Sequence, residues 1–277
     1  MKTSMKKFSH IVNLVDFPTK SDLYTAQQVT IETMRIARGF SADTVDVTLL
    51  SAQYPEDRKV VPEYFIATRD LDQSVLDVAD FNVRRKLPLV KDILDRAYET
   101  APDYIIFTNV DIGLLPNFYT SVSNLIDSGF DSFIINRRTI SKVHTRVEDI
   151  PRMYTEVGQP HMGYDCFVFK RDAYKNFILG LTCVGAAHIG KAVLVNQLLN
   201  SNKFNVFRDL HVTFHIGNDK TWTSKPLKDY EEHNRREFRN IVSGLNAKQR
   251  ALIRKSLSNH RWRGLKNKIT RFLKLSE

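Results

Sequence analysis

Short apolar runs alternate with helix-length segments along most of this chain, and this alternation restricts its fold more than any other feature. The runs are rich in β-branched and aromatic residues, as buried strands are. The predicted strands cover residues 10–17, 45–50, 104–111, 131–136, 165–170, 204–207 and 211–216. The predicted helices cover residues 22–38, 89–99, 118–128, 171–179 and 191–200, with helical periodicity again from residue 229. Since strands joined by helices form parallel sheets covered on both faces, we predict a three-layer α/β/α sandwich with a mostly parallel central sheet.

The strand predicted at residues 104–111 ends in a polar cluster with the sequence TNVD, and Gly113 follows it. Ligands of open α/β sheets bind at the carboxyl ends of strands. Alternate residues of a strand lie on one face, so Asn109 and Asp111 could both reach one hard cation or one ribose. An isolated aspartate at such a position often only caps a turn or the next helix, and that alternative stays open.

Two histidines, His211 and His215, lie in the late sequence HVTFHIGND. In a helix this spacing would place both on one face, as in zinc sites. The residues between them, Val212, Thr213 and Phe214, favour a strand instead, in which the two histidines again share a face. Both are candidate metal ligands; the alternative for either is a core histidine bonded to a backbone group.

A third candidate group is the sequence GYDCFVF at residues 163–169. Gly163 permits close approach of the backbone, and Asp165 stands at the start of a predicted strand. Asp165 could instead belong to an ordinary turn. Arg137 and Arg138 follow another predicted strand, where two guanidinium groups suit phosphates, although a solvated strand end has the same composition.

Cysteine usage and hydropathy indicate the compartment. Cys166 and Cys183 both lie in apolar stretches, so we expect buried free thiols rather than a disulfide. The apolar stretch near the N-terminus is interrupted by Asn13 and Asp16, too soon for a signal peptide. The longest nearly uncharged run, residues 177–187, is far shorter than the ~20 residues that span a bilayer. We therefore expect a cytoplasmic protein.

The formal net charge of +10 is concentrated in the C-terminal region. Residues 235–277 hold 13 Lys and Arg residues but only two acidic residues, which leaves residues 1–234 with a net charge of −1. A nearly neutral body argues against an extended basic groove for nucleic acid. We predict a globular domain over residues 1–228 and a basic helical extension over residues 229–277.

The end of this extension has the pattern of an amphipathic helix. Its apolar stripe consists of Trp262, Leu265, Ile269 and Phe272, spaced as one helical face, with basic residues around it. A basic amphipathic helix is typical of a membrane-surface element or a partner helix, and here it predicts contact with an anionic membrane. Equally, the stripe could pack on the body of the protein.

In element order, residues 10–220 resemble the GT-A fold of bacterial-type nucleotide-diphospho-sugar glycosyltransferases. The resemblance rests on an early strand, a strand that ends in a carboxylate near residue 110 and a histidine-bearing strand near residue 215. The short motif of that family is Asp-x-Asp. This chain has Asn109-Val110-Asp111 in that place, with an amide instead of the first carboxylate. The implied fold is a GT-A-like sandwich followed by the basic helical tail.

The resemblance implies roles for the candidate residues. Asp111 matches the metal-binding carboxylate, and His215, with His211 second, matches a late metal or pyrophosphate ligand; the cofactor would be Mn²⁺ or Mg²⁺. Asp165 matches the catalytic base that acts on the acceptor hydroxyl. An amide at Asn109 can still accept a hydrogen bond from ribose. The implied substrate-binding residues are Asp16, Asn109, Arg137, Arg138, His161 and Gly163, with Asp16 at the uracil or ribose and His161 at the acceptor.

The implied function is transfer of a sugar from a nucleotide-sugar donor to a hydroxyl of a glycan or lipid-linked saccharide, in cell-surface polysaccharide synthesis. Lipid-linked acceptors lie at the cytoplasmic leaflet, where a basic tail would hold the enzyme. One alternative is a nucleotidyltransferase, but the loop DFPTKSD at residues 16–22 lacks the glycine-rich sequence usual after the first strand. Another is a non-catalytic basic protein that binds nucleic acid or membranes. No nucleic-acid recognition motif accompanies the charge, so we expect no nucleic-acid partner.

Overall fold

The computed structural model describes residues 5–161, 163–217 and 227–258. Its contacts divide the chain into two compact units, each built from separate stretches of sequence. The first unit comprises Met1–Asp72, Asp92–Lys175 and Asn202–Asp219, and the second comprises Gln73–Lys91, Asn176–Ser201 and Lys220–Glu277. The predicted division, into residues 1–228 and 229–277, instead separates two consecutive stretches of sequence, and it stays a prediction.

A seven-stranded sheet forms the centre of the first unit, in the order β10-β6-β9-β4-β1-β2-β3. Its strands are β1 (Lys6–Val12), β2 (Val45–Ser51), β3 (Ile66–Ala67), β4 (Tyr104–Thr108), β6 (Ser132–Ile135), β9 (Cys166–Lys170) and β10 (Phe204–Phe207). All neighbouring pairs are parallel except those of β9, which is antiparallel to both β4 and β6. The prediction of a mostly parallel α/β sheet is confirmed.

The reversed direction of β9 gathers three chain segments at one edge of the sheet. Cys166, the first residue of β9, pairs with Thr108, the last residue of β4, and also with Ile135, the last residue of β6. The residues just before β9 therefore lie beside those just after β4 and β6. This is the edge at which α/β sheets bind their ligands.

A second, four-stranded sheet continues from this edge, in the order β5-β11-β7-β8. Its strands are β5 (Gly113–Leu114), β7 (Arg138–Ile140), β8 (Gln159–Pro160) and β11 (Thr213–Ile216). Phe214 of β11 pairs with Gly113 on one side and Arg138 on the other. Any side chain at Gly113 would overlap the Phe214 ring, so this close strand approach requires glycine.

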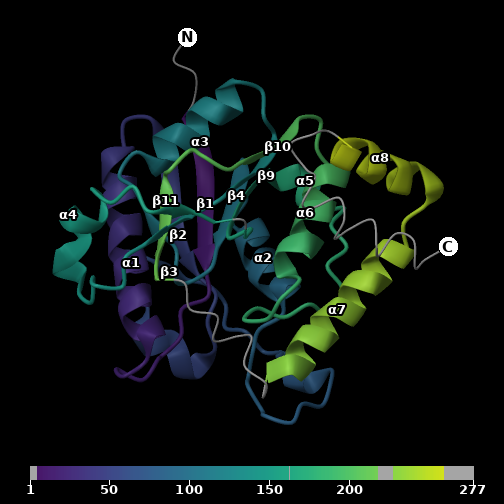
Figure 1. Ribbon diagram of the computed structural model, residues 1–277, viewed down its shortest axis with the longest axis horizontal. Helices are drawn as coiled ribbons and strands as arrows, with labels where there is room; N and C mark the ends of the chain where they lie inside the picture. Colours follow the sequence, from purple (N-terminus) through teal and green to yellow (C-terminus); the bar gives the residue numbers. More distant parts are fainter. Residues whose placement is uncertain (1–4, 162, 218–226, 259–277) are drawn as a thin grey trace. The chain divides into compact units, whose positions relative to one another are not determined.

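Helices cover both faces of the central sheet (Figure 1). The helices of the first unit are α1 (Asp22–Phe40), α2 (Val90–Glu99), α3 (Phe118–Asp127), α4 (Ile150–Met153) and α5 (Arg171–Tyr174); those of the second unit are α6 (Ile189–Leu199), α7 (Lys228–Ser243) and α8 (Ala247–Ser258). Met34 of α1 and Phe118 of α3 share a buried cluster with Phe8 of β1. Ser9 points to the opposite face, where its hydroxyl lies 2.8 Å from that of Thr100, just after α2. The predicted three layers are thus present.

A side-chain cap sets the start of α1, which begins at residue 22 as predicted. Ser21 is the N-cap, and its hydroxyl accepts a hydrogen bond from the backbone N–H of Leu23 at 3.2 Å. Two strands differ most from their predicted ranges. β1 covers Lys6–Val12 rather than residues 10–17, and β4 ends at Thr108 rather than Asp111, because its pairing with β1 ends at Phe107 and the chain turns.

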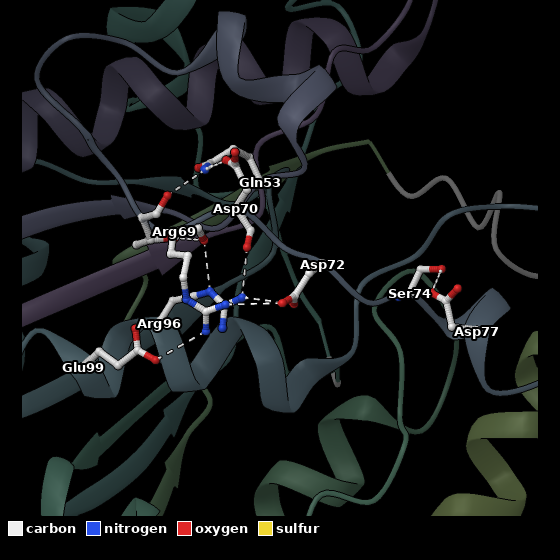
Figure 2. A network of polar contacts seen from close by, with 9 residues as sticks. Gln53, Arg69, Asp70, Asp72, Ser74, Asp77, Arg96 and Glu99 are labelled. Carbon is white, nitrogen blue, oxygen red and sulfur yellow. Dashed lines mark hydrogen bonds and ion pairs between the residues drawn. The ribbon is translucent and has the colours of Figure 1, made fainter.

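A polar network that the sequence did not indicate fixes the loop after β3 to α2 (Figure 2). Arg96 of α2 is only 3% exposed and donates to the carbonyl oxygens of Arg69 and Asp70, both at 3.0 Å. The Asp70 carboxylate in turn accepts from Gln53 and Arg58, each at 2.8 Å. A buried arginine is tolerated here because backbone carbonyls satisfy it.

The second unit contains α6, α7 and α8. Asn234 of α7 bonds both backbone groups of Cys183, with its Oδ1 2.9 Å from the Cys183 nitrogen and its Nδ2 2.9 Å from the carbonyl oxygen. Cys183 and Cys166 are both buried free thiols, as predicted. Among the described residues, no helix is both long and apolar enough to cross a membrane. The stripe from Trp262 to Phe272 lies outside the described residues.

Candidate functional site

Asp111 and His215 form the first of two side-chain pairs beyond the edge of the sheet. Asp111 lies in the turn that follows β4, and His215 lies on β11. Their atoms Oδ2 and Nε2 are 3.0 Å apart, although the residues are 104 positions apart in sequence. The pairing of β11 with β5, which follows the turn, brings them together.

The tautomer of His215 follows from its second contact. Nδ1 lies 2.7 Å from the carbonyl oxygen of Gly217, which can only accept, so Nδ1 carries a hydrogen. Nε2 then faces a carboxylate oxygen of Asp111 across 3.0 Å. An imidazole nitrogen and a carboxylate oxygen can share a hydrogen bond at this distance or serve as two ligands of one metal cation. A histidine whose Nδ1–H donates to a backbone carbonyl is oriented as metal-binding histidines are.

Arg137 and Asp165 form the second pair. Nη1 of Arg137 lies 2.9 Å from Oδ1 of Asp165, and the side chains are only 10% and 11% exposed. Asp165 immediately precedes β9 and Arg137 lies just beyond β6, so the strand register explains the contact. The neighbouring segment is fixed as well: Asn136 Nδ2 donates to the carbonyl oxygen of His161 at 2.9 Å, and the His161 N–H donates to that of Arg137 at 3.2 Å.

We call Asp111, His215, Arg137 and Asp165 the four-residue cluster. Burial raises the pKa of Asp111, but the hydrogen bond and charge of His215, helped by the charge of Arg137, outweigh it and the pKa lies below its usual value. Burial also raises the pKa of Asp165. There Arg137 only partly offsets it and the carboxylate of Asp111 adds to it, so the pKa lies above its usual value. The pKa values of the two carboxyl groups are thus shifted in opposite directions.

Several buried polar atoms at this edge lack a hydrogen-bond partner within the described part of the chain. They are Oδ1 of Asp111, Oδ2 of Asp165, Oδ1 of Asn136 and Nε of Arg137. A buried donor or acceptor without a partner costs about 1–3 kcal/mol. Four such atoms in one place indicate a site built for a polar ligand.

Gly163 borders the open oxygen of Asp165. A Cβ at Gly163 would lie 3.2 Å from Oδ2 of Asp165 and only 2.5 Å from Nε2 of His161. His161 and Asp165 therefore approach the same side of Gly163, and the absence of a side chain there lets the His161 ring pack close to the backbone. The sequence placed His161, Gly163 and Asp165 in one site, and the structure brings them together.

The other candidate residues lie apart from these contacts. Arg138 donates to the carbonyl oxygens of Val157 and Gly158, at 2.8 and 2.9 Å, and so stabilises the connection between β7 and β8. Asp16 forms an exposed ion pair with Lys59 at 2.5 Å. Both contacts are structural, and neither tests the predicted substrate-binding role of Arg138 or Asp16.

Two predicted alignments are wrong. His211 does not share a strand face with His215, because β11 begins only at Thr213 and His211 has a left-handed backbone with φ 49°. The strand alternation assumed for Asn109 and Asp111 does not apply either, since β4 ends before both. Their predicted roles toward a metal and a ribose stay predictions.

Asp111 and His215 fit a divalent cation in donor type and spacing. Their facing atoms are 3.0 Å apart, which suits neighbouring ligands of an octahedral ion with bonds of about 2.1 Å. The described residues contain no group of three or more His, Cys, Asp or Glu side chains that could hold an ion. Such a site would therefore need further ligands from substrate phosphates and water, as Mg²⁺ sites commonly do.

The pairing of Arg137 with Asp165 could not be found from the sequence. The sequence indicates Arg137 as a phosphate ligand, whereas in the structure one of its terminal nitrogens bonds the carboxylate of Asp165. The pair depends on β9 running antiparallel between β4 and β6. Nothing local in the sequence near Asp165 indicates that direction.

No model of a known protein family matches the chain, and no curated protein matches its sequence. Its structure is similar to that of TarS 1–349 from S. aureus. The complex with UDP-GlcNAc gives a TM-score of 0.56 at 11% identity, covering 92% of this chain and 72% of that one. The complex with UDP gives 0.54 at 13% identity, covering 92% and 71%. At such identities the likeness concerns the fold, and the chain has a GT-A-like fold.

Proposed function

We propose that this chain is a glycosyltransferase that uses a nucleotide-sugar donor. The observation that carries the proposal is the four-residue cluster at the carboxyl edge of a GT-A-like sheet, where Asp111 lies 3.0 Å from His215 and Asp165 lies 2.9 Å from Arg137. Supporting it, similar structures of TarS hold UDP-GlcNAc and UDP. The acceptor would be a hydroxyl of a glycan or lipid-linked saccharide, in cell-surface polysaccharide synthesis.

On the donor side, Asp111 and His215 would hold Mn²⁺ or Mg²⁺ together with the pyrophosphate. The ion would neutralise the negative charge that develops as the nucleotide diphosphate leaves. His215 is oriented for this by its bond to the Gly217 carbonyl, and Asp111 keeps Oδ1 free of protein partners among the described residues. Asn109 and Asp16 would contact the ribose and the uracil.

On the acceptor side, Asp165 would act as general base. In a direct displacement the acceptor oxygen forms a bond to the anomeric carbon of the donor sugar. The bond from that carbon to the phosphate oxygen breaks, and its electron pair leaves with the nucleotide diphosphate. The hydroxyl proton passes to Oδ2 of Asp165, the oxygen without a protein partner beside Gly163 and His161.

Cell location is part of the same proposal. An enzyme with lipid-linked acceptors gains from contact with the cytoplasmic face of a membrane. The 13 basic residues within residues 235–277 support this, since each contributes roughly 1 kcal/mol near an anionic surface.

The test is a panel of nucleotide diphosphates and nucleotide sugars, with and without Mn²⁺, read by thermal shift and then by sugar transfer. The wild-type protein should be stabilised by one donor, and more so with Mn²⁺. Asp111→Asn should lose that stabilisation and at least about 100-fold in metal-dependent transfer, because the ion would lose its carboxylate ligand. The matched control is Asp172→Asn, which removes an aspartate that is 66% exposed. Normal metal-dependent turnover by Asp111→Asn would contradict the assignment.

A further inference from the structure

We propose that Arg137 is a positioning residue for the proposed base: it binds one oxygen of Asp165 and thereby presents the other oxygen to the acceptor. This inference rests on the proposed function. The sequence indicates that Arg137 binds donor phosphates, and this inference assigns it a different role.

The two carboxylate oxygens of Asp165 differ in their contacts. Oδ1 accepts from Nη1 of Arg137 at 2.9 Å, and both side chains are nearly buried. Oδ2 has no partner in the described part of the chain and lies on the side of Gly163 that the His161 ring also approaches. An aspartate has a short side chain, so a bond at one oxygen fixes the direction of the other. A base must lie within hydrogen-bond reach of the proton it takes, which makes this direction decisive.

The backbone around Arg137 is itself held in place. Its carbonyl oxygen accepts from the His161 N–H at 3.2 Å, and the side chain of Asn136 donates to the carbonyl of His161 at 2.9 Å. The next residue, Arg138, binds the carbonyl oxygens of Val157 and Gly158. Arg137 therefore projects from a fixed connection between β6 and β7, as a positioning residue requires.

Charge supports the same role. Burial favours the protonated form of Asp165, which cannot act as a base, and the adjacent charge of Arg137 opposes this effect. Without Arg137, Asp165 would lose both its fixed orientation and its closest positive charge.

The experiment compares Arg137→Gln, Asp165→Asn and the double variant by donor affinity and by kcat for transfer. Arg137→Gln should lower kcat roughly 100-fold, within the range for loss of general base catalysis, while the Kd for the nucleotide diphosphate stays as in wild type. In the Asp165→Asn background the same change should add little further loss, because Arg137 acts through Asp165. Arg152→Gln, which changes an arginine that is 81% exposed, is the matched control.

Weakened donor binding with preserved kcat in Arg137→Gln would overturn the proposal and restore the phosphate role, for which Nε of Arg137 is available. The proposal would also be overturned if the double variant showed the full kcat losses of Arg137→Gln and Asp165→Asn combined. If Arg137→Gln does not fold, Arg137→Lys serves instead: it keeps the charge, and its kcat should lie between those of wild type and Asp165→Asn with donor affinity unchanged. If the wild-type protein transfers no sugar, the proposed function fails. The positioning role is then judged by crystal structures, in which Asp165 should turn away in Arg137→Gln and not in Arg152→Gln.

Discussion

His10 should make the stability of this protein fall steeply in mild acid. The side chain is fully buried on β1, with Nδ1 2.8 Å from the hydroxyl oxygen of Tyr119 and Nε2 2.9 Å from that of Thr108. Burial lowers its pKa from 6.5 to about 3, because the imidazolium would lose its hydration in the core. Thr108 ends β4, one residue before Asn109. Protonation of His10 would therefore change a hydrogen bond to the strand that leads to the site.

The sign and size of this change in the free energy of unfolding follow from proton linkage. Between pH 6.5 and about 3 the unfolded chain binds a proton at His10 and the folded chain does not, so stability is lost as the pH falls below 6.5. Each pH unit in this window corresponds to about 1.4 kcal/mol. Between about pH 7.5 and about pH 5 the His10 contribution to the free energy of unfolding therefore falls by about 2 kcal/mol.

The assay is urea unfolding of wild type and His10→Gln at both pH values. The wild-type protein should lose about 2 kcal/mol more than the variant between them, whatever the variant loses in absolute stability. The NMR signal of the His10 ring in the wild-type protein should not titrate above about pH 4. Equal pH dependence of the two proteins, or a ring that titrates near pH 6.5, would refute the reasoning.

Gly113→Ala should destabilise the protein by about 1–3 kcal/mol in urea unfolding, since its Cβ would overlap the Phe214 ring, whereas the control Gly39→Ala, with nothing within 4 Å of the new Cβ, should cost nothing. A Gly113→Ala protein as stable as Gly39→Ala would show that β5 and β11 are not packed as described. Gly163→Ala should fold normally but raise the KM for the acceptor more than that for the donor, because its Cβ would push aside the His161 ring beside Asp165; a selective loss of donor affinity would argue against an acceptor site there. Removing residues 259–277 should release the protein from anionic vesicles in sedimentation at low salt, with no change in melting temperature. A lowered melting temperature without vesicle binding by the intact chain would instead show that the apolar stripe packs on the body.

Much of the fold could be predicted because its signals are local. β10 covers residues 204–207 as predicted, and β2, β6, α3 and α6 differ from their predicted ranges by only a few residues. The helix start at residue 22 and the β-branched run at residues 45–50 depend on residues within a few positions, so sequence alone predicts them. The predicted boundaries are wrong where pairing with a distant strand determines the end of a strand, as at Thr108.

The sequence by itself determined the fold class and selected Asp111, Asp165 and His215 as candidate site residues, because each follows, precedes or lies on a run that reads as a strand. Only the tertiary structure decided their partners. The antiparallel direction of β9 brings Asp165 to Arg137, and the second sheet brings His215 to Asp111 across 104 positions. Backbone hydrogen bonds form equally well in many strand orders and directions. Which order is stable depends on how all the buried side chains pack together, and a local sequence pattern does not contain that information.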